Sequence, residues 1–194
     1  MGGKSKVFFQ NRKGYFFLID ALIGSTIIFL ALGIILSSDV KQSSVKYDYM
    51  LAEDYSTFIM NSRMEDLNNL YINNLTSAGI ITNTRNSIME QVDEFYYNAR
   101  YLCSGGANIT CVNENLNHAT TLVQNLTDSL ISSKYGFKYT LMDSSLGRNE
   151  TIYERGADKL NDSTGIIASK KITFLQINAT TLFGPQIVEI KIWV

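Results

Sequence analysis

Residues 15–36 read YFFLIDALIGSTIIFLALGIIL, and this stretch decides the fold of the chain. It contains a single charged residue, Asp20, among 22 positions. A helix rises about 1.5 Å per residue, so the run is long enough to cross a bilayer core about 30 Å thick. The sequence therefore predicts a membrane-spanning helix over residues 15–36.

The segment before this helix carries positive charge without any acid. Its cations are Lys4, Lys6, Arg12 and Lys13. Because the cytoplasmic flanks of membrane helices are rich in lysine and arginine, we expect the N-terminus inside the cell and everything after Leu36 outside. A secretory signal has a shorter apolar region that ends at a small-x-small site. Here the apolar residues continue past residues 31–33, so we expect no cleavage there.

The composition is that of one globular head with an appendage. The chain has 194 residues, of which 45% are hydrophobic and 18% charged, so it can bury a core and is not disordered. With 17 basic and 18 acidic residues it has no basic excess to hold nucleic acid. His118 is the only histidine, and the sequence has no P-loop, nucleophile-elbow or HExxH pattern. We therefore expect a protein that is not an enzyme, without a cofactor or metal, and an exposed His118.

Helical periodicity continues beyond the apolar run. Apolar residues recur at helical intervals from Val45 to Leu70, which predicts that the first helix continues with one face on the head. We expect a break at residues 73–83 around Gly79. Two further helices should follow, with apolar faces made of Ile88, Val92, Phe95, Ala99 and Leu102, and of Leu116, Ala119, Leu122, Leu126 and Leu130.

Two cysteines, Cys103 and Cys111, bound the stretch CSGGANITC that joins these two helices. Their spacing favours a disulfide that closes a short loop in an oxidising compartment. Free thiols, or a metal site completed by His118, are the alternatives. A disulfide here predicts a helical hairpin pinned at its tip.

After Ser133 the pattern changes to that of β-strands. Four segments are rich in β-branched and aromatic residues, namely residues 135–143, 150–156, 165–177 and 185–194. In the last, Val188, Ile190 and Ile192 alternate with polar residues, so one face of the sheet is expected on the helix. The predicted fold is α+β: a long hydrophobic N-terminal helix packed on an antiparallel sheet of about four strands, with the disulfide-linked helical hairpin inserted between.

The sequence Arg12-Lys13-Gly14 followed by YFFLIDALIG resembles type IV pilins and related archaeal surface proteins. In this family a prepilin peptidase cuts after the glycine and leaves the apolar run on the mature protein. The resemblance implies processing at Lys13, Gly14 and Tyr15, with the cut between Gly14 and Tyr15. It divides the chain into a leader at 1–14, a hydrophobic helix at 15–45 and an extracellular head at 46–194.

The resemblance also implies a function. The mature chain would be a structural subunit of an extracellular filament used for adhesion or motility, a homopolymer held together by its N-terminal helices. Its partners would be the prepilin peptidase and the pilus assembly machinery, and its precursor would reside in the cytoplasmic membrane. The alternatives are a minor pilin or pseudopilin of a secretion or DNA-uptake system, and a binding or sensor domain held by an uncleaved anchor.

Asp20 is the candidate assembly residue. An acid inside an apolar run costs roughly 2.5 to 3.5 kcal/mol on insertion scales and is by default a functional hypothesis. The cut after Gly14 would create an α-amine on Tyr15, which a neighbouring subunit presents to Asp20. Bacterial pilins usually place a glutamate at the fifth mature residue, whereas Asp20 is the sixth, as in an archaeal FxxDAL-like run. The alternative is an acid that reaches the lipid headgroups.

Six Asn-x-Ser/Thr triplets follow the apolar run, at Asn74, Asn108, Asn125, Asn149, Asn161 and Asn178. They predict a glycosylated outer surface, the alternative being accidental triplets in an Asn-rich and Thr-rich chain. The small residues Gly24, Ser25 and Gly33 favour close helix packing. Aromatic residues at helical spacing are interpreted as core residues: Tyr47, Tyr49, Tyr55, Phe95, Tyr96, Tyr97 and Tyr101.

Overall fold

A computed structural model describes residues 11–103 and 108–194. Within the first helix, the side chains of residues 11–18 and 35–49 are outside the description. The predicted processing residues Lys13, Gly14 and Tyr15 therefore lie outside the described side chains, as do Tyr47 and Tyr49. The chain divides into two compact units, residues 1–46 and 47–194.

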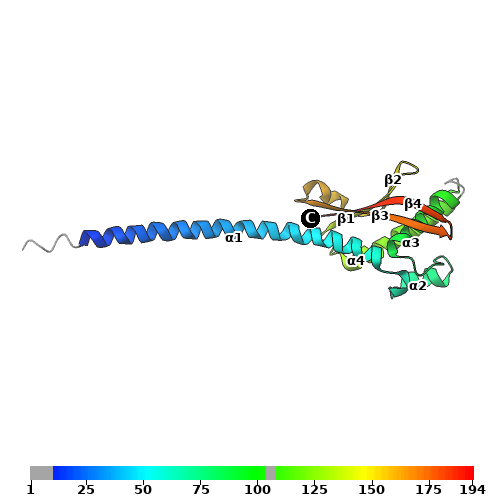
Figure 1. Cartoon of the computed structure of the whole chain (residues 1–194), viewed down its shortest axis with the longest axis horizontal. Helices are drawn as coiled ribbons and strands as arrows, with labels where there is room; N and C mark the ends of the chain where they lie inside the picture. The colour runs from blue at the N-terminus through cyan, green and yellow to red at the C-terminus, as the bar shows by residue number, and fades with distance from the viewer. Residues whose placement is uncertain (1–10, 104–107) are drawn as a thin grey trace, which may run out of the picture. The chain divides into compact units, whose positions relative to one another are not determined.

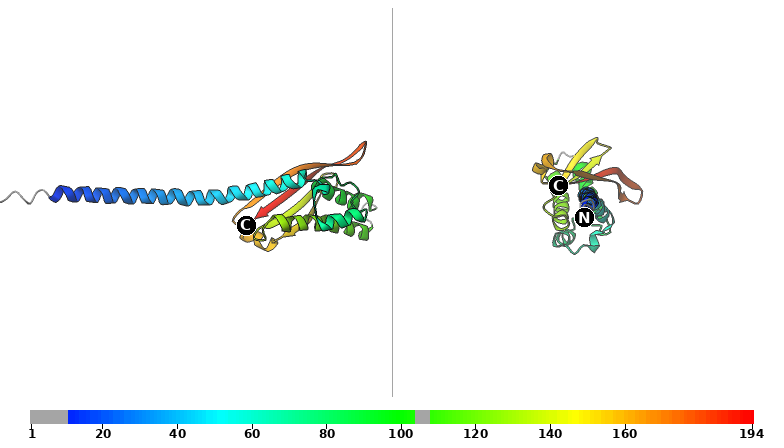
Figure 2. Two further views of the ribbon diagram at one scale, coloured as in Figure 1. Left: turned by 90° about the horizontal axis from the view of Figure 1, so that it is seen from below. Right: turned by 90° about the vertical axis from the view of Figure 1, so that its left-hand side faces the viewer.

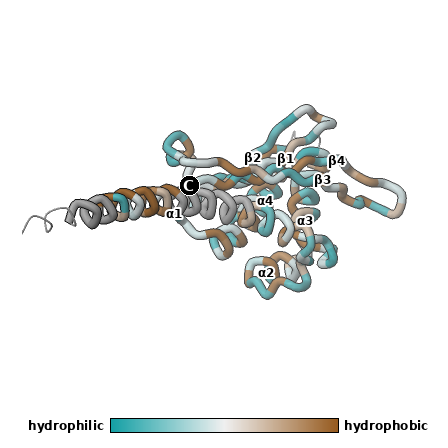
Figure 3. The backbone as a smooth tube through the Cα atoms, turned by 60° about the vertical axis from the view of Figure 1, so that its left-hand side comes forward, coloured by the Kyte–Doolittle hydropathy of each residue, from teal (hydrophilic) through white to brown (hydrophobic). Residues whose placement is uncertain are grey.

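The first unit contains most of helix α1, which runs from Asn11 to Asn61. Between residues 19 and 34 its residues are mostly apolar, and the coloured part of α1 in Figure 3 is largely brown. In the described part of the chain, no helix is both long enough and apolar enough to cross a membrane. The predicted span over residues 15–36 extends beyond the described side chains at both ends, and it stays a prediction.

The head, residues 47–194, is built on a four-stranded antiparallel sheet in the order β2-β1-β4-β3 (Figure 1). Its strands are β1 Gly136–Asp143, β2 Arg148–Arg155, β3 Ile166–Asn178 and β4 Thr181–Trp193. The predicted α+β class and the antiparallel sheet are confirmed. Strands β2 and β3 form its two edges.

Helices of the head lie on one face of this sheet (Figures 1 and 2). They are the end of α1, α2 Leu70–Ser77, α3 Ile88–Tyr97 and α4 Ile109–Leu130. A capping box begins α3, since Ser87 and Glu90 each accept a backbone N–H of the other. Short turns complete the head: η1 Met64–Asp66, the π-helical turn η2 Asn98–Leu102, and η4 Ala157–Asp162.

The core lies between the sheet and these helices. The alternation predicted for the last strand is confirmed, since Val188, Ile190 and Ile192 are all buried. They pair across the sheet with Leu141, Tyr139 and Phe137 of β1, which face the same side. Ala52, Tyr55 and Ile59 contribute the last turns of α1 to the same core. Of the predicted core aromatics, Tyr55, Phe95 and Tyr96 are buried, and Tyr97 and Tyr101 are half-buried.

The prediction that the first helix continues to Leu70 is wrong. The helix α1 ends at Asn61, and Leu70 begins the separate helix α2. The buried stripe explains this end, because continuing it beyond Ile59 by three and four residues would place Ser62 and Arg63 on the core face. Arg63 instead leaves the helix and forms a β-bridge with Ser87.

The predicted apolar face of the next helix is correct as far as Ala99 and wrong at Leu102, which is 64% exposed. The π-helical turn at Asn98–Leu102 widens the helix there and rotates Leu102 away from the core. In α4 the predicted face is buried at Ala119, Leu122 and Leu126, but Leu130 in the last turn is exposed.

Candidate functional site

The part of α1 between residues 19 and 34 presents apolar side chains on all sides. Ile27, Ile28, Phe29 and Leu30 are consecutive, and each is between 61% and 75% exposed. Successive helical residues point about 100° apart, so these four side chains cover the whole circumference. A helix that meets water on one face is polar there, whereas this one is suited to apolar surroundings on every side.

Asp20 differs from the other polar groups of this segment. The hydroxyl of Ser25 donates to the carbonyl of Leu22 at 2.9 Å, and that of Thr26 donates to the carbonyl of Ile23 at 2.8 Å. These hydroxyls are therefore satisfied within the helix. The exposed carboxylate of Asp20 is the group that an apolar environment would leave in need of an external cation.

The two glycines of this segment leave flat places on the helix. Apart from the adjacent residues and the helix's own backbone, no described atom lies within 4 Å of the Cβ that an alanine would add at Gly24 or Gly33. A neighbouring helix can approach such positions closely. Their spacing of nine residues places them about two and a half turns apart on α1.

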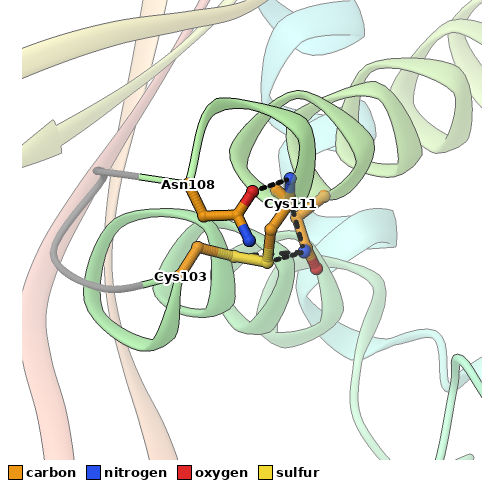
Figure 4. Close-up of a disulfide and its surroundings, with 4 residues drawn as sticks. Cys103, Asn108 and Cys111 are labelled. Carbon is orange, nitrogen blue, oxygen red and sulfur yellow. Dashed lines mark hydrogen bonds between the residues drawn. A yellow bond between two sulfur atoms is a disulfide. The ribbon is translucent and has the colours of Figure 1, made fainter.

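The disulfide between Cys103 and Cys111 is present (Figure 4). It joins the end of η2 to the first turn of α4, with Cα atoms 5.8 Å apart. The Oδ1 atom of Asn108 caps α4 by accepting the backbone N–H of Cys111 at 3.2 Å, and Asn115 donates to the carbonyl of Cys111 at 2.9 Å. The predicted pinned hairpin is confirmed, and the free-thiol and metal alternatives are excluded for these two cysteines.

Replacing both cysteines with serine should lower the free energy of unfolding by about 2.5 kcal/mol, because the unfolded chain regains the entropy of a short closed loop. For a chain of this length, that corresponds to a fall in Tm of roughly 5 to 10 °C. Thermal unfolding followed by circular dichroism measures it. A reductant should lower the Tm of the wild type by a similar amount and leave that of the double variant unchanged; equal stability of all four samples would contradict the expectation.

All six asparagines of the Asn-x-Ser/Thr triplets are exposed in the structure. They are distributed over α2, the start and the second half of α4, strand β2, the turn η4 and the end of strand β3. At Asn108 the capping atom is Oδ1, so the cap does not use Nδ2, the atom that carries an N-linked glycan. Glycosylation requires an exposed asparagine, and all six positions meet this requirement. That they carry glycans stays a prediction.

Asn178 is the last residue of β3, directly before the β3–β4 turn. Its Oδ1 accepts the backbone N–H of Thr180 at 3.0 Å and contacts the hydroxyl of the same threonine at 3.1 Å. Thr180 is the third residue of this triplet, so the turn brings the asparagine and the threonine together at an exposed position.

His118 is not the exposed side chain that the sequence predicts. It is half-buried on α4, where its ring lies 5.6 Å from that of Phe95 and its Nδ1 is 3.1 Å from the hydroxyl of Tyr71. It therefore helps to hold α2 against α3 and α4. Among the described residues, no group of three or more potential ligands is placed to hold a metal ion.

Asp143 organises one end of the head, which we call the loop end: the β1–β2 turn, the β3–β4 turn and the disulfide all lie beyond it. Its Oδ2 accepts the hydroxyls of Tyr101 at 2.9 Å and Tyr96 at 3.2 Å, and its Oδ1 accepts the backbone N–H groups of Ser145 and Leu146. Burial raises the pKa of Asp143, but the bonds from Tyr101, Leu146 and Ser145 outweigh burial and lower it. Sequence reasoning missed this residue, and the turn signal after β1 was the one local cue.

The chain was compared with protein-family models, with curated proteins and with solved structures. No family model matches it, and neither a curated protein nor a solved structure shows significant similarity to it.

Proposed function

We propose that this chain is the precursor of a structural subunit of an extracellular type IV pilus-like filament, used for adhesion or motility. The observation that carries the proposal is the segment of α1 between residues 19 and 34, which exposes apolar side chains on its whole circumference and one carboxylate. A bilayer accommodates such a helix before assembly, and a bundle of identical helices accommodates it afterwards.

Processing provides the charge that Asp20 needs. The cut between Gly14 and Tyr15 removes the cationic leader and creates an α-amine at the start of the apolar run. In the assembled bundle this amine lies against Asp20 of an adjacent subunit, because two opposite charges in apolar surroundings are costly unless they are paired. The pair selects one axial register for the incoming subunit.

The head supports the same function through its surface. Its six exposed triplet asparagines would carry glycans on the outside of the filament. Its disulfide at the loop end stabilises a domain that works outside the cell, where disulfides persist. The subunit's partners are then other copies of the same chain, the prepilin peptidase and the assembly machinery.

Treatment of the full-length chain with a prepilin peptidase should remove residues 1–14 and leave Tyr15 as the first residue. Intact mass and N-terminal sequencing by mass spectrometry measure the product. Gly14→Val should block the cut, whereas Gly24→Val, at a position with open space around it, should not. Persistence of residues 1–14 in the wild type would refute the processing step and favour a permanently anchored domain.

A further inference from the structure

A pocket opens beside the edge strand β3 at the place where three segments distant in sequence meet. It has a volume of about 290 Å³ and is lined by the loop before α3, by α3 and the turn η2 that follows it, and by residues 175–177 of β3. Such a volume is just below the usual range of about 300 to 1,000 Å³ for small-molecule sites, so it suits a small ligand.

The polar wall of this pocket is a chain of hydrogen bonds. The side-chain amide of Asn83 donates to Oδ1 of Asn86 at 2.5 Å, and Nδ2 of Asn86 donates to Oε2 of Glu94 at 2.8 Å. Asn83 is itself fixed, since its Oδ1 accepts the backbone N–H of Arg85. The carboxylate of Glu94 is therefore held in one orientation before any ligand arrives, which lowers the cost of binding.

The remaining walls supply amides and an aromatic ring. Asn98 and Gln176 carry both donor and acceptor atoms, and Tyr97 presents a half-buried ring that is stacked on Tyr101 with centroids 5.3 Å apart. Tyr97 also contacts the ring of Phe183 at a centroid distance of 4.9 Å, so its position is fixed.

The charges of the lining exclude several classes of ligand. No lysine, arginine or histidine is among the described residues that line the pocket, so phosphate and carboxylate ligands lack a counter-charge. One carboxylate is too few for a hard divalent cation, which takes six or more oxygen ligands. Burial raises the pKa of Glu94, against smaller opposing effects of Gln91 and Asn86, so the site resists an extra charge.

We propose that this pocket binds a neutral sugar, whose hydroxyls are matched by Glu94, Asn98 and Gln176 and whose apolar ring face packs on Tyr97. Hydroxyls both donate and accept, which is what a set of amides and one carboxylate complements. The pocket binds and does not hydrolyse, because glycoside hydrolysis ordinarily uses two carboxyl groups roughly 5 to 10 Å apart and only Glu94 is present among the described lining residues. The inference concerns the head alone and does not depend on polymerisation.

The test uses the full chain, produced without glycosylation and kept in a detergent whose headgroup is not a sugar. Saturation-transfer difference NMR with methyl glycosides of neutral hexoses and N-acetylhexosamines should show binding of at least one of them, with roughly millimolar affinity. Glu94→Gln should weaken binding at least about tenfold and Gln176→Ala about threefold or more. Gln124→Ala, an exposed glutamine of α4, is the matched control and should leave the affinity unchanged.

The sugar can belong to an external glycan or to a glycan of this chain. The candidate glycosylation site Asn178 lies two residues beyond Gln176 on β3, so a glycan attached there is close to the pocket. In the natively glycosylated chain, equal binding by wild type and Asn178→Gln assigns the pocket to an external glycan. Binding that appears only in Asn178→Gln assigns it to the chain's own glycan. Absence of binding by every glycoside, or equal affinity of wild type, Glu94→Gln and Gln176→Ala, overturns the proposal.

Discussion

Replacing Asp20 with alanine should reduce the yield of sheared filaments at least about a hundredfold, while the processed subunit accumulates in the membrane. The α-amine of Tyr15 would then be buried in the helix bundle without its partner. Removing one member of a buried ion pair costs about 3 to 5 kcal/mol, and each 1.4 kcal/mol changes an association constant tenfold. This free-energy cost applies at every contact between subunits along the filament, so the yield of filaments falls steeply.

Two further variants isolate the charge of Asp20 from its size. Asp20→Asn keeps the shape and removes the charge, so it should fail like Asp20→Ala, whereas Asp20→Glu should retain part of the assembly. Ser25→Ala is the matched control, because the Ser25 hydroxyl is already satisfied by the carbonyl of Leu22. Electron microscopy and quantification of sheared filaments provide the readout. Wild-type yields from Asp20→Ala would favour the permanently anchored domain instead.

Replacing Asp93 with asparagine should make the head markedly more stable at alkaline pH. Asp93 lies in α3 and is fully buried, and its carboxyl group has at most a weak hydrogen bond, to Thr173, to offset the burial. Burial raises the pKa of Asp93 from 3.8 to about 8, with a lowering contribution from Thr173 and a further raising one from Glu90. The hydroxyl of Tyr139 is also buried and has no hydrogen-bond partner among the described residues. It is neutral, so it does not offset a negative charge on Asp93.

The direction of the pH dependence follows from the raised pKa. Between about pH 4 and pH 8 the folded chain binds one proton more than the unfolded chain at Asp93, so the free energy of unfolding falls as pH rises through this window. The slope is at most about 1.4 kcal/mol per pH unit. The stability that comes from the extra proton on Asp93 in the folded chain is fully present below about pH 4 and is lost above about pH 8.

Thermal unfolding of the full chain at a series of pH values tests this. At pH 8 and above, Asp93→Asn should have a Tm at least roughly 5 °C higher than the wild type. The wild type loses several kcal/mol of stability when the pH rises to this range, and the variant, which has no carboxyl group at this position, does not. At pH 4 the two should be nearly equal. Asp162→Asn, at an exposed position of η4, is the control and should follow the wild type. A wild-type Tm that is the same at pH 5 and pH 9 would contradict the assignment.

The β-sheet was predictable from the sequence because each strand carries a local pattern of β-branched and aromatic residues. The four predicted segments match the observed strands, with the largest error at the start of β4, predicted at Pro185 and observed at Thr181. A proline lacks the N–H that a ladder needs and is therefore common at the first residue of a strand. The register of β3 and β4 shifts between Thr173 and Leu175, opposite this proline, and the ladder continues to Thr181 beyond it.

The errors in the helices have a different origin. Leu102 continues the regular 3.6-residue pattern of the sequence, and that pattern does not show the π-helical turn that exposes this side chain. The end of α1 at Asn61 was visible in the sequence, since the apolar stripe stops at Ile59, but the periodicity was extended through Leu67 to Leu70.

Some of the sites have a local sequence pattern and were predictable, whereas others are assembled by the fold and were not. The disulfide was predictable because its two cysteines are close in sequence, and the triplet asparagines because the motif is local. The pocket beside β3 was not, because Asn86, Glu94 and Gln176 come from three separate segments that the fold brings together. Asp93 was missed because acidic neighbours on a helix usually face solvent, as the half-buried Glu90 and Glu94 do in part.

Electron cryomicroscopy of sheared filaments tests the central claim most directly. The account predicts a core of α1 helices that begin at Tyr15, with the α-amine of Tyr15 within about 4 Å of the Asp20 carboxylate of a neighbouring subunit, as an ion pair requires. The heads should lie outside this core. Filaments whose subunits retain residues 1–14, or whose contacts are made by the heads with α1 outside the core, would contradict it.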